Sequence, residues 1–413
     1  MRILSGAAAA ARVRKMAARG SRYAEVEPAV RRIIADVRKR GDRALRKYAE
    51  QWDGLGRQES VQVSEPEIQA AWKAAAPELK ACLRSAAANI RRFCEWQKPV
   101  EWTRTRKGIT VGQIVRPLDL VGCYVPGGRY PLVSTLLMTV IPAQVAGVQN
   151  IRVVSPQPKA EVLAAAGMLG VREVYRIGGA QAIAALAYGT QSVPRVDKIV
   201  GPGNLYVTAA KKLVSFDCAI DFLAGPTEVV IVSDVGTPDF IAADLVAQAE
   251  HDPEAFAIFI TTRDDLARGV ARATENLSRN NAVARQSLRR NGVILVSDSR
   301  SQSLEWANEL AVEHLTVDAA DVALVRNAGS VFIGDYSPQA AGDYASGPNH
   351  VLPTGGAARF RGGLSVLDFV KLISVQKLSL PGVRGIAPVV ESLANAEGLR
   401  AHAESIRSRV GHA

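Results

Sequence analysis

The chain has 413 residues, of which 48% are hydrophobic and 22% are charged, and its formal net charge is +11. This composition is typical of an ordinary globular protein and argues against disordered and fibrous classes. No apolar run approaches the roughly 18–20 residues that a membrane-spanning helix needs, so we expect no membrane span. Four scattered cysteines form no CxxC pair, which favours a reducing, cytoplasmic location over a disulfide-stabilised secreted one.

Much of the positive excess lies near the N-terminus, in residues 12–47. A nucleic-acid-binding surface is one interpretation of this charge. The other is a solvated helix face, because Arg31 and Arg32 alternate with apolar residues at helical spacing and no aromatic residues are interleaved. The second interpretation fits better, and we expect no nucleic-acid partner.

Helical patterns dominate the first hundred residues. The Ala- and Arg-rich start, residues 7–19, is interpreted as a helix rather than a transit peptide, because acidic residues occur in the helical pattern that follows. Amphipathic spacing predicts further helices at 25–40, 42–52, 65–74 and 77–96. From 109 to 115 the apolar residues alternate, as in a strand or ribbon.

Two runs of short apolar strands alternating with helices follow. Strands are predicted at 120–125, 151–155, 174–177, 198–200 and 219–221, and then at 228–233, 257–261, 293–296, 314–317 and 330–333. The helices include 239–252, a long one at 263–290, one after about 366 and one at about 385–407. This rhythm is typical of parallel sheets covered by helices. We therefore predict an α/β fold with two doubly wound lobes and a cleft between them.

The helix at 239–252 carries a possible metal-binding pair. Gln248 and His251 are three residues apart, so they share one face near its C-terminus. A carboxamide oxygen and an imidazole at this spacing can hold one side of a divalent metal ion. A surface glutamine beside a hydrogen-bonded histidine is the alternative, and only the placement of the other histidines can decide between them.

Three glycine-containing loops follow strands of the first α/β run. They are Tyr124-Val125-Pro126-Gly127-Gly128-Arg129, Gly178-Gly179-Ala180-Gln181 and Gly201-Pro202-Gly203-Asn204. Each opens a helix, where backbone N–H groups and the helix dipole favour a phosphate. Any one of them can be explained by turn geometry alone, but three at one sheet edge favour a nucleotide site. Arg129 would add charge there, and Gln181 and Asn204 would bond ribose or amide groups.

The chain has five histidines, and most of them lie beside acids or amides. They are His251, His314, His350, His402 and His412. Imidazole and oxygen donors without a thiolate suit zinc or a similar divalent ion. The adjacent pair of Glu313 and His314 offers a carboxylate that can activate water and an imidazole that can move protons.

Eight stretches together resemble the histidinol dehydrogenase family, in the family's order and over essentially the whole chain. They are VGCYVPGGRYP, IGGAQAIAALAYGT, KIVGPGNLYVTAAKK, DFLAGPTEVVIVSD, DLVAQAEHDP, EHLTV, GDYASGPNHVLPTGGAARFRGGLSV and AEGLRAH. The resemblance implies oxidation of L-histidinol through L-histidinal to L-histidine, a four-electron reaction that uses two NAD in turn and a zinc ion that holds the substrate.

The resemblance also implies roles for individual residues. The zinc ligands would be Gln248, His251, Asp343 and His402. The catalytic acid–base residues would be Glu313 and His314. Thr227, His350 and Glu397 would contact the substrate together with the zinc ligands and the acid–base pair. Tyr124, Gln181 and Asn204 would contact NAD.

The fold implied by the resemblance has two incomplete Rossmann-like, aldehyde-dehydrogenase-like lobes. The expected regions are a helical N-terminal region at 1–117 that packs with 227–364, an NAD-binding domain at 118–226, a zinc and catalytic domain at 227–364, and a C-terminal helical segment at 365–413. In the family this last segment is exchanged between protomers. Glu397 and His402 would then complete the site of the other subunit, in an obligatory homodimer.

Two alternatives to the histidinol reaction stay open. Thr227 stands where many family members have Ser, Val312 replaces a frequent Pro, and the loop around Arg129 is similar to that of related dehydrogenases that oxidise other polar alcohols, such as sulfopropanediol dehydrogenase. A zinc- and NAD-dependent enzyme for another small polar alcohol is therefore the first alternative. The second is a metal-dependent hydrolase in which Glu313 activates water without a redox step.

Overall fold

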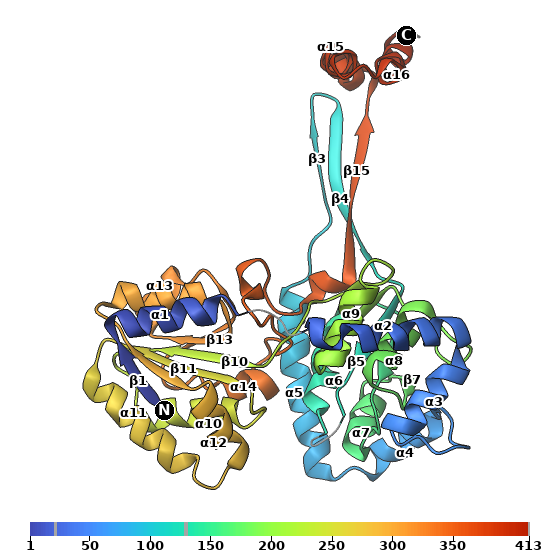
Figure 1. Cartoon of the computed structure of the whole chain (residues 1–413). Coiled ribbons are helices and arrows are strands. Elements are labelled where there is room, and N and C mark those ends of the chain that lie inside the picture. Colours follow the sequence, from blue (N-terminus) through green and yellow to red (C-terminus); the bar gives the residue numbers. More distant parts are fainter. Residues whose placement is uncertain (20–22, 128–130, 412–413) are drawn as a thin grey trace.

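The computed structural model describes residues 1–19, 23–127 and 131–411 of the chain. It consists of two α/β lobes that lie side by side and a long arm that rises from the first lobe and carries the C-terminus (Figure 1). This confirms the predicted α/β class with two doubly wound lobes. In the described ranges no helix is long and apolar enough to cross a membrane.

The first lobe is built on a six-stranded sheet in the order β2-β7-β6-β5-β8-β9. The strands are β2 (Gln62–Val63), β5 (Leu120–Tyr124), β6 (Asn150–Val154), β7 (Glu173–Tyr175), β8 (Lys198–Val200) and β9 (Ala219–Ile220). All pairs are parallel except β2 with β7. The helices between these strands are α6 (Val133–Ala146), α7 (Ala160–Met168), α8 (Gly179–Tyr188) and α9 (Leu205–Val214). The chain order reverses between β5 and β8, which is where doubly wound sheets open a ligand crevice.

The N-terminal helices pack mostly on the first lobe. They are α2 (Tyr23–Arg40), α3 (Asp42–Trp52), α4 (Glu65–Ala74) and α5 (Pro77–Trp96). Helix α2 buries an apolar stripe against α8 and α9, and α4 and α5 pack on α7 and α6. The expected packing of 1–117 with 227–364 is therefore wrong for most of the surface of these helices, although α5 also contacts the second lobe, where Asn89 Nδ2 donates to Ala345 O at 2.9 Å. Helical periodicity predicts which face of a helix is buried, but it does not say which lobe covers that face.

The second lobe repeats this order in another six-stranded sheet, β1-β12-β11-β10-β13-β14, in which the edge strand β1 is parallel to its neighbour, unlike β2. Its strands are β1 (Arg2–Ser5), β10 (Glu228–Val232), β11 (Phe256–Thr261), β12 (Val293–Val296), β13 (Val312–Val317) and β14 (Ala328–Ile333). Its helices are α1 (Gly6–Ala17), α10 (Pro238–Ala249), α11 (Asp264–Leu277), α12 (Ala282–Arg290), α13 (Arg300–Leu310) and α14 (Gln339–Tyr344), with the short 3₁₀ turns η1 (Ala319–Leu324) and η2 (Ala357–Arg359). Of the N-terminal region, β1 and α1 pack here, on β12 and α13.

The long helix predicted at 263–290 is two helices, α11 and α12. The break has a local cause, since the side chain of Asn281 accepts a hydrogen bond from Ala284 N at 3.0 Å and thereby caps α12. Asparagine favours such N-cap positions because its side chain satisfies an otherwise unpaired helical N–H group.

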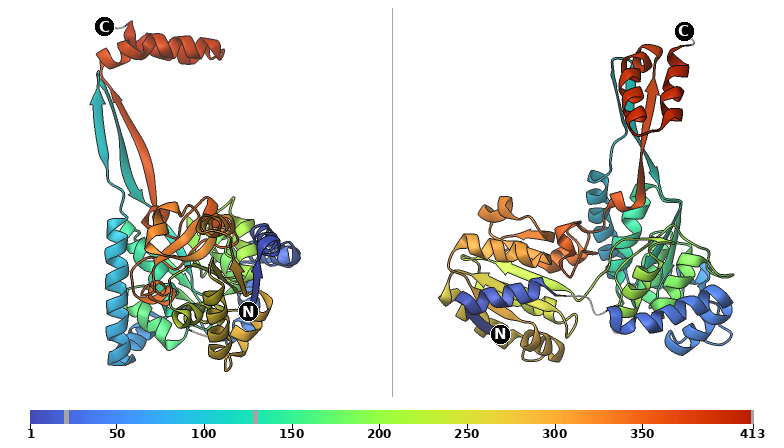
Figure 2. Two further views of the ribbon diagram at one scale, coloured as in Figure 1. Left: turned by 90° about the vertical axis from the view of Figure 1, so that its left-hand side faces the viewer. Right: turned by 45° about the horizontal axis from the view of Figure 1, so that its top comes forward.

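The arm is a three-stranded antiparallel sheet topped by two helices (Figure 2). It contains β3 (Trp102–Arg106), β4 (Ile109–Pro117), β15 (Val370–Leu378), α15 (Leu380–Ala396) and α16 (Arg400–Val410). The ribbon expected at 109–115 is confirmed as β4. The helix expected after 366 is only the 3₁₀ turn η3 (Val366–Phe369), after which the chain runs as β15 along β4. Leu372 and Ile373 on β15 remain 51% and 43% exposed, so this chain alone leaves apolar surface of the arm uncovered.

Candidate functional site

The predicted acid–base pair lies at the start of β13. His314 is in register with Val229 of β10, and both strands begin at this edge of the second sheet. Doubly wound sheets usually bind ligands at the carboxyl ends of their strands, whereas this cluster lies at the opposite edge. It reaches the first lobe through His350, whose ring nitrogen Nε2 lies 3.4 Å from the hydroxyl of Thr135 on α6.

The carboxylate of Glu313 is buried and held by two donors. Its Oε2 atom accepts from Thr227 Oγ1 at 2.5 Å and from the backbone N–H of Glu228 at 2.9 Å. Burial raises the pKa of Glu313 to about 7, against the opposing effect of the neighbouring His314. A carboxyl group with this pKa can both accept and release a proton near neutral pH.

The hydroxyl of Thr227 links this carboxylate to the predicted metal ligand Gln248. The side-chain nitrogen of Gln248 donates to Thr227 Oγ1, while the threonine hydroxyl donates to Glu313. Because the amide nitrogen is used in this way, the amide oxygen of Gln248 is the atom that can face a metal ion.

His314 is held in one tautomer by the backbone. Its Nδ1 atom lies 3.3 Å from the carbonyl oxygen of Glu228, which can only accept, so in the neutral ring Nδ1 carries the proton and Nε2 keeps its lone pair. Nε2 lies 3.5 Å from Asp343 Oδ1 but is buried without a hydrogen-bond partner among the described residues. Burial acts to lower the pKa of His314, but the carboxylates of Glu313 and Asp343 outweigh it and raise the pKa.

Asp343 and His350 complete the cluster from the segment around α14. His350 donates from Nδ1 to the carbonyl oxygen of Asp343 at 2.8 Å, and burial lowers the pKa of its imidazole. Burial acts to raise the pKa of Asp343, but the nearby imidazole of His314 lowers it overall, and His350 and His251 also contribute. The carboxylate of Asp343 is therefore held in its ionised form, which a metal ligand requires.

Helix α10 ends at Ala249, before the predicted end at 252. His251 lies in the bend that follows and is exposed, and its backbone N–H donates to the carbonyl oxygen of Gln248 at 3.4 Å. The two predicted ligands thus stay close to each other without sharing one helix.

Two predicted site residues lie elsewhere. Glu397 ends α15 and His402 is on α16, and both are exposed at the tip of the arm (Figures 1 and 2). Within the part of the chain that the structure describes, no three His, Cys, Asp or Glu side chains lie close enough to hold a metal ion. One chain therefore brings together Thr227, Gln248, Glu313, His314, Asp343 and His350, with His251 nearby, but not Glu397 or His402.

The predicted nucleotide loops meet at one edge of the first sheet. A side chain at Gly201 would collide with the carbonyl oxygen of Tyr124, and side chains at Gly127 and Gly178 would collide with Pro156. These close backbone approaches require glycine. The loops after β5, β7 and β8 are therefore adjacent, as three phosphate-binding turns on one site would be. Arg129 lies outside the described residues.

The three predicted NAD contacts are held differently. Tyr124 is buried, and its hydroxyl accepts from Gly179 N at 3.0 Å. Gln181 is buried with its side-chain oxygen unpaired among the described residues, which leaves an acceptor for a ligand. Asn204 caps α9, since its side-chain oxygen accepts from Tyr206 N at 3.0 Å and Val207 N at 3.1 Å, so only its amide nitrogen is free to reach a ligand.

Sequence reasoning missed the residue that holds this loop from beneath. Asp53, at the end of α3, accepts from Gly178 N and from Gln181 Nε2, both at 3.0 Å. Burial raises the pKa of Asp53. No local pattern marks it, because its partners lie more than a hundred positions away in the chain.

A buried ion pair supports the third loop and gives a prediction about stability. The side chains of Lys211 and Asp221 are 2% and 0% exposed. Lys211 Nζ also donates to Gly201 O at 2.9 Å, and the Asp221 carboxylate accepts from Gly201 N at 2.8 Å. Lys211→Met leaves the carboxylate buried and unpaired, so the free energy of unfolding of the first lobe should fall by about 3–5 kcal/mol in urea denaturation.

Lys212→Met is the matched control for this variant. Lys212 is half exposed and pairs with Glu27, an ion pair of the kind that adds little to stability. Its urea midpoint should stay near that of the unaltered chain. Equal midpoint shifts for the two variants would show that the buried pair has no special part in the loop.

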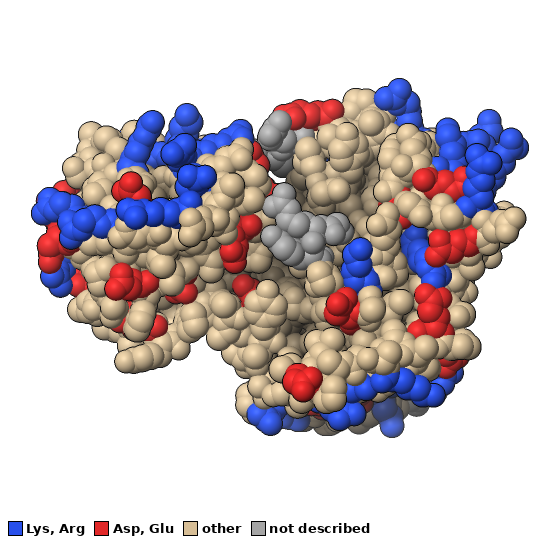
Figure 3. Space-filling model, turned by 90° about the horizontal axis from the view of Figure 1, so that it is seen from below, with Lys and Arg blue, Asp and Glu red and all other residues tan. Residues whose placement is uncertain are grey.

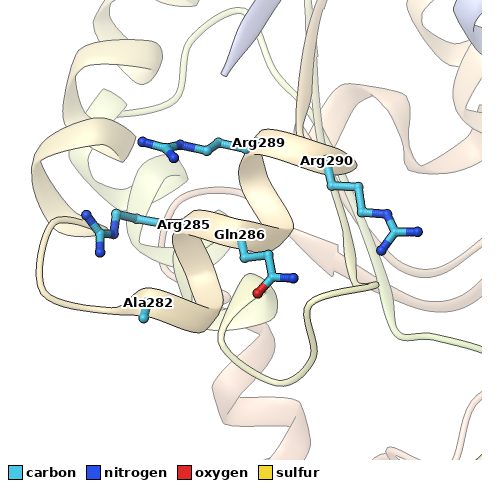
Figure 4. Close-up of a pocket in the computed structure, with 5 residues that line it drawn as sticks. All are labelled: Ala282, Arg285, Gln286, Arg289 and Arg290. Atoms are coloured by element: carbon cyan, nitrogen blue, oxygen red, sulfur yellow. The ribbon is translucent and has the colours of Figure 1, made fainter.

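Outside this region, Arg300 forms ion pairs with Asp234, Asp318 and Asp321. Arg285, Gln286, Arg289 and Arg290 line a hollow on α12 together with Ala282, but all five belong to a single solvent-facing helix (Figure 4). On the face of the molecule seen from below, basic side chains lie mainly around the outer rims of both lobes (Figure 3).

Comparison with known proteins decides the family. The model of the family described as histidinol dehydrogenase matches residues 16–410. The chain belongs to the histidinol dehydrogenase family. It is 48% identical over 395 residues to the histidinol dehydrogenase of Methanothermobacter thermautotrophicus, with 92% of each chain covered. It is 46% identical to that of Geobacter sulfurreducens, with 94% of each chain covered.

A solved structure agrees with this assignment. The crystal structure of histidinol dehydrogenase from Elizabethkingia anophelis matches with a TM-score of 0.95 and 35% identity, covering 100% of this chain and 98% of that one. The expected family is therefore confirmed. The chain is an oxidoreductase, and membership of the family supports histidinol oxidation in histidine biosynthesis.

Proposed function

We propose that this chain oxidises L-histidinol through L-histidinal to L-histidine, removing four electrons with two NAD in turn. The observation that carries the proposal is the buried pair of Glu313 and His314, in which the backbone holds one imidazole nitrogen and leaves Nε2 unpaired. A base of this kind, close to a raised-pKa carboxyl group, suits two successive proton-coupled oxidations.

The donor set around this pair fits zinc. Gln248, His251 and Asp343 offer an amide oxygen, an imidazole and an ionised carboxylate, and His402 would add a second imidazole. Tyr124, Gln181 and Asn204 would hold NAD at the edge of the first sheet. When bound, NAD accepts the hydride in each oxidation, and zinc orients the imidazole and amine of the substrate.

His314 acts first in the proposed sequence. Its Nε2 atom takes the proton from the substrate alcohol as the hydride leaves the adjacent carbon, which produces the aldehyde. The carbonyl oxygen of Glu228 stabilises the resulting imidazolium through Nδ1. The substrate is held in position during this step by contacts with Thr227, His350 and Glu397.

Glu313 acts in the second oxidation. Its carboxylate accepts a proton from the water that adds to the aldehyde carbon, and the protonated His314 returns its proton to the aldehyde oxygen, which produces the hydrate. Loss of a second hydride from that carbon, with loss of a hydroxyl proton, gives the carboxylic acid. The pKa of about 7 lets Glu313 take up this proton and release it within one turnover.

The functional unit we propose is a homodimer with shared sites. The arm projects away from its own lobes, carries Glu397 and His402 at its tip, and exposes apolar residues along β15 (Figure 2). Exchange of the arm between two subunits would cover this surface and bring both residues to the cluster of the other chain. A cytoplasmic location also belongs to the proposal, and the four free cysteines support it.

The experiment that tests this function follows the absorbance of NADH with limiting L-histidinol. About two NADH should form per histidinol, because four electrons need two two-electron acceptors. A chelator should abolish the reaction and zinc should restore it. If NADH forms from another small polar alcohol, such as sulfopropanediol, but not from histidinol, the proposed substrate is wrong. If the protein adds water to a substrate without forming NADH, it is the metal-dependent hydrolase.

A further inference from the structure

Three connections join the two lobes, and their described residues lie against one another. They run between α1 and α2, between β9 and β10, and between α14 and η3. Tyr23, the first residue of α2 after the first connection, donates to Ala224 O on the second at 3.2 Å. Gly225 on the second donates to Thr354 Oγ1 on the third at 2.5 Å. Any change in the relative position of the lobes must therefore move or distort this bundle of connections.

The side chain of Glu228 ties all three connections together. It starts β10, directly after the second connection, and is 2% exposed. Arg19, from the first connection, donates to it in a two-pronged contact, with Nε to Oε1 at 2.6 Å and Nη2 to Oε2 at 2.7 Å. Gly355 N, from the third, donates to Oε1 at 3.1 Å.

The backbone of the same residue holds the acid–base pair. Its N–H binds the Glu313 carboxylate at 2.9 Å, and its carbonyl oxygen lies 3.3 Å from Nδ1 of His314. Side chains alternate between the faces of an extended chain, so Thr227 points to the cluster while Glu228 points away from it to Arg19. The dipeptide Thr227-Glu228 therefore makes the hydrogen bonds described above for Glu313 and His314. The remaining contact described is that of His314 with Asp343.

Arg19 also reaches the second strand of the site. Its Nη2 donates to Leu310 O at 3.1 Å, at the end of α13 and just before β13, and its Nη1 donates to Met16 O at 2.8 Å. One guanidinium group therefore binds the chain at the start of β10 and just ahead of β13. A guanidinium suits this position because its donors form a rigid planar fork.

We propose that Arg19 and Glu228 are positioning residues for the reaction. Their ion pair holds the backbone of Glu228, which orients Glu313 and sets the tautomer of His314, and it anchors the acid–base pair to the connections that place the nucleotide lobe. Arg19 has no contact with the side chains of the cluster, and the Glu228 carboxylate meets Glu313 only at its backbone N–H. This inference rests on the proposed roles of Glu313 and His314.

The alternative is an ion pair that contributes to stability alone, and Arg361 provides the control for it. Arg361 pairs with Asp368 at 3.3 Å and donates to Asp221 O, so it also joins the third connection to the second, but it has no contact with Glu313 or His314. Its side chain is 21% exposed, against 13% for Arg19. Loss of either arginine removes a partly buried pair from the same bundle.

The test compares R19M and E228Q with R361M in the full-length enzyme. For R19M and E228Q we expect kcat to fall about 10- to 100-fold, the cost of misplacing reacting groups by a fraction of an ångström to an ångström. KM for histidinol and zinc content should stay close to those of the unaltered chain. R361M should lower the melting temperature and leave kcat unchanged. If R19M does not fold, E228Q, which keeps the side-chain volume, makes the same comparison.

Crystal structures of the variants separate this inference from the proposed function. In R19M or E228Q the Glu313 carboxylate should lose its contacts with Glu228 N and Thr227 Oγ1, whichever alcohol is the substrate. Unchanged positions of Glu313 and His314, or a fall in kcat equal to that of R361M, would overturn the inference. If the unaltered chain does not oxidise histidinol, only the substrate assignment is wrong. The crystallographic comparison still decides whether Arg19 and Glu228 position the acid–base pair.

Discussion

Replacing His314 with alanine should lower kcat for histidinol oxidation by about 100- to 10,000-fold, the usual contribution of a positioned general base. The buried Nε2 atom has no hydrogen-bond partner in the described ranges, and it is the lone pair placed to take the alcohol proton. His314 is not a proposed zinc ligand, so zinc content should not change. The measurement is the rate of the first NADH burst after rapid mixing with histidinol.

Glu313→Gln should separate the two oxidations. The amide keeps the shape of the side chain but cannot accept a proton from water, so the first NADH should form at a normal rate and the second should be slow. Supplying histidinal directly should leave this variant nearly inactive, whereas His314→Ala is expected to show its largest defect with histidinol.

Thr316→Ala is the matched control for both variants. Thr316 lies two residues beyond His314 on the same face of β13, is buried, and contacts Gln339 rather than the acid–base pair. The rates of its first and second NADH bursts should match those of the unaltered chain. A normal first burst in His314→Ala would remove His314 as the base, and a defect of similar size in Thr316→Ala would assign the loss to general damage of the strand.

Mixing two inactive variants should restore activity if sites are shared. His402→Ala removes a proposed zinc ligand on the arm, and His314→Ala removes the base on the second lobe, so each homodimer should be nearly inactive. In a mixed dimer with exchanged arms, one site carries both changes and the other carries neither. Co-expression should therefore recover about a quarter of full activity, since half of randomly paired dimers are mixed and each has one intact site.

His402→Ala with Glu397→Ala provides the control for this experiment. Both changes lie on the arm, so every site in a mixed dimer receives one altered arm and no activity should return. Restoration by the first pair and not by the second would establish exchange of the arm between subunits. If dimers form but neither pair recovers activity, His402 does not act across subunits and the proposal of shared sites is wrong.

Local chemistry explains why much of the site could be predicted from sequence. The alternation of apolar strands and helices follows the periodicity of each element, and the bounds of most strands differ from the prediction by only a few residues. Glu313 and His314 are neighbours in the chain, so one strand must carry both. Glycines 178 and 201 mark turns because a side chain there would collide with backbone or proline atoms.

Packing errors arose where the partner surface is distant in sequence. The apolar stripes of α2 and α5 were predicted correctly, but whether the first or the second sheet covers them depends on the shapes of both lobes. The strand β15 was missed for a related reason. Its residues extend because they pair with β4, more than 250 positions earlier, and no local turn announces that pairing.

The sequence by itself determined the fold class, the two sheets, the glycine loops and the adjacency of Glu313 and His314, because each depends on short-range periodicity or on adjacent residues. Only the tertiary structure decided that Asp53 holds Gln181, that Arg19 reaches Glu228, and that the tip of the arm stands apart from the cluster. These contacts join segments whose spacing carries no local signal, and they form only when the packed lobes bring complementary groups together.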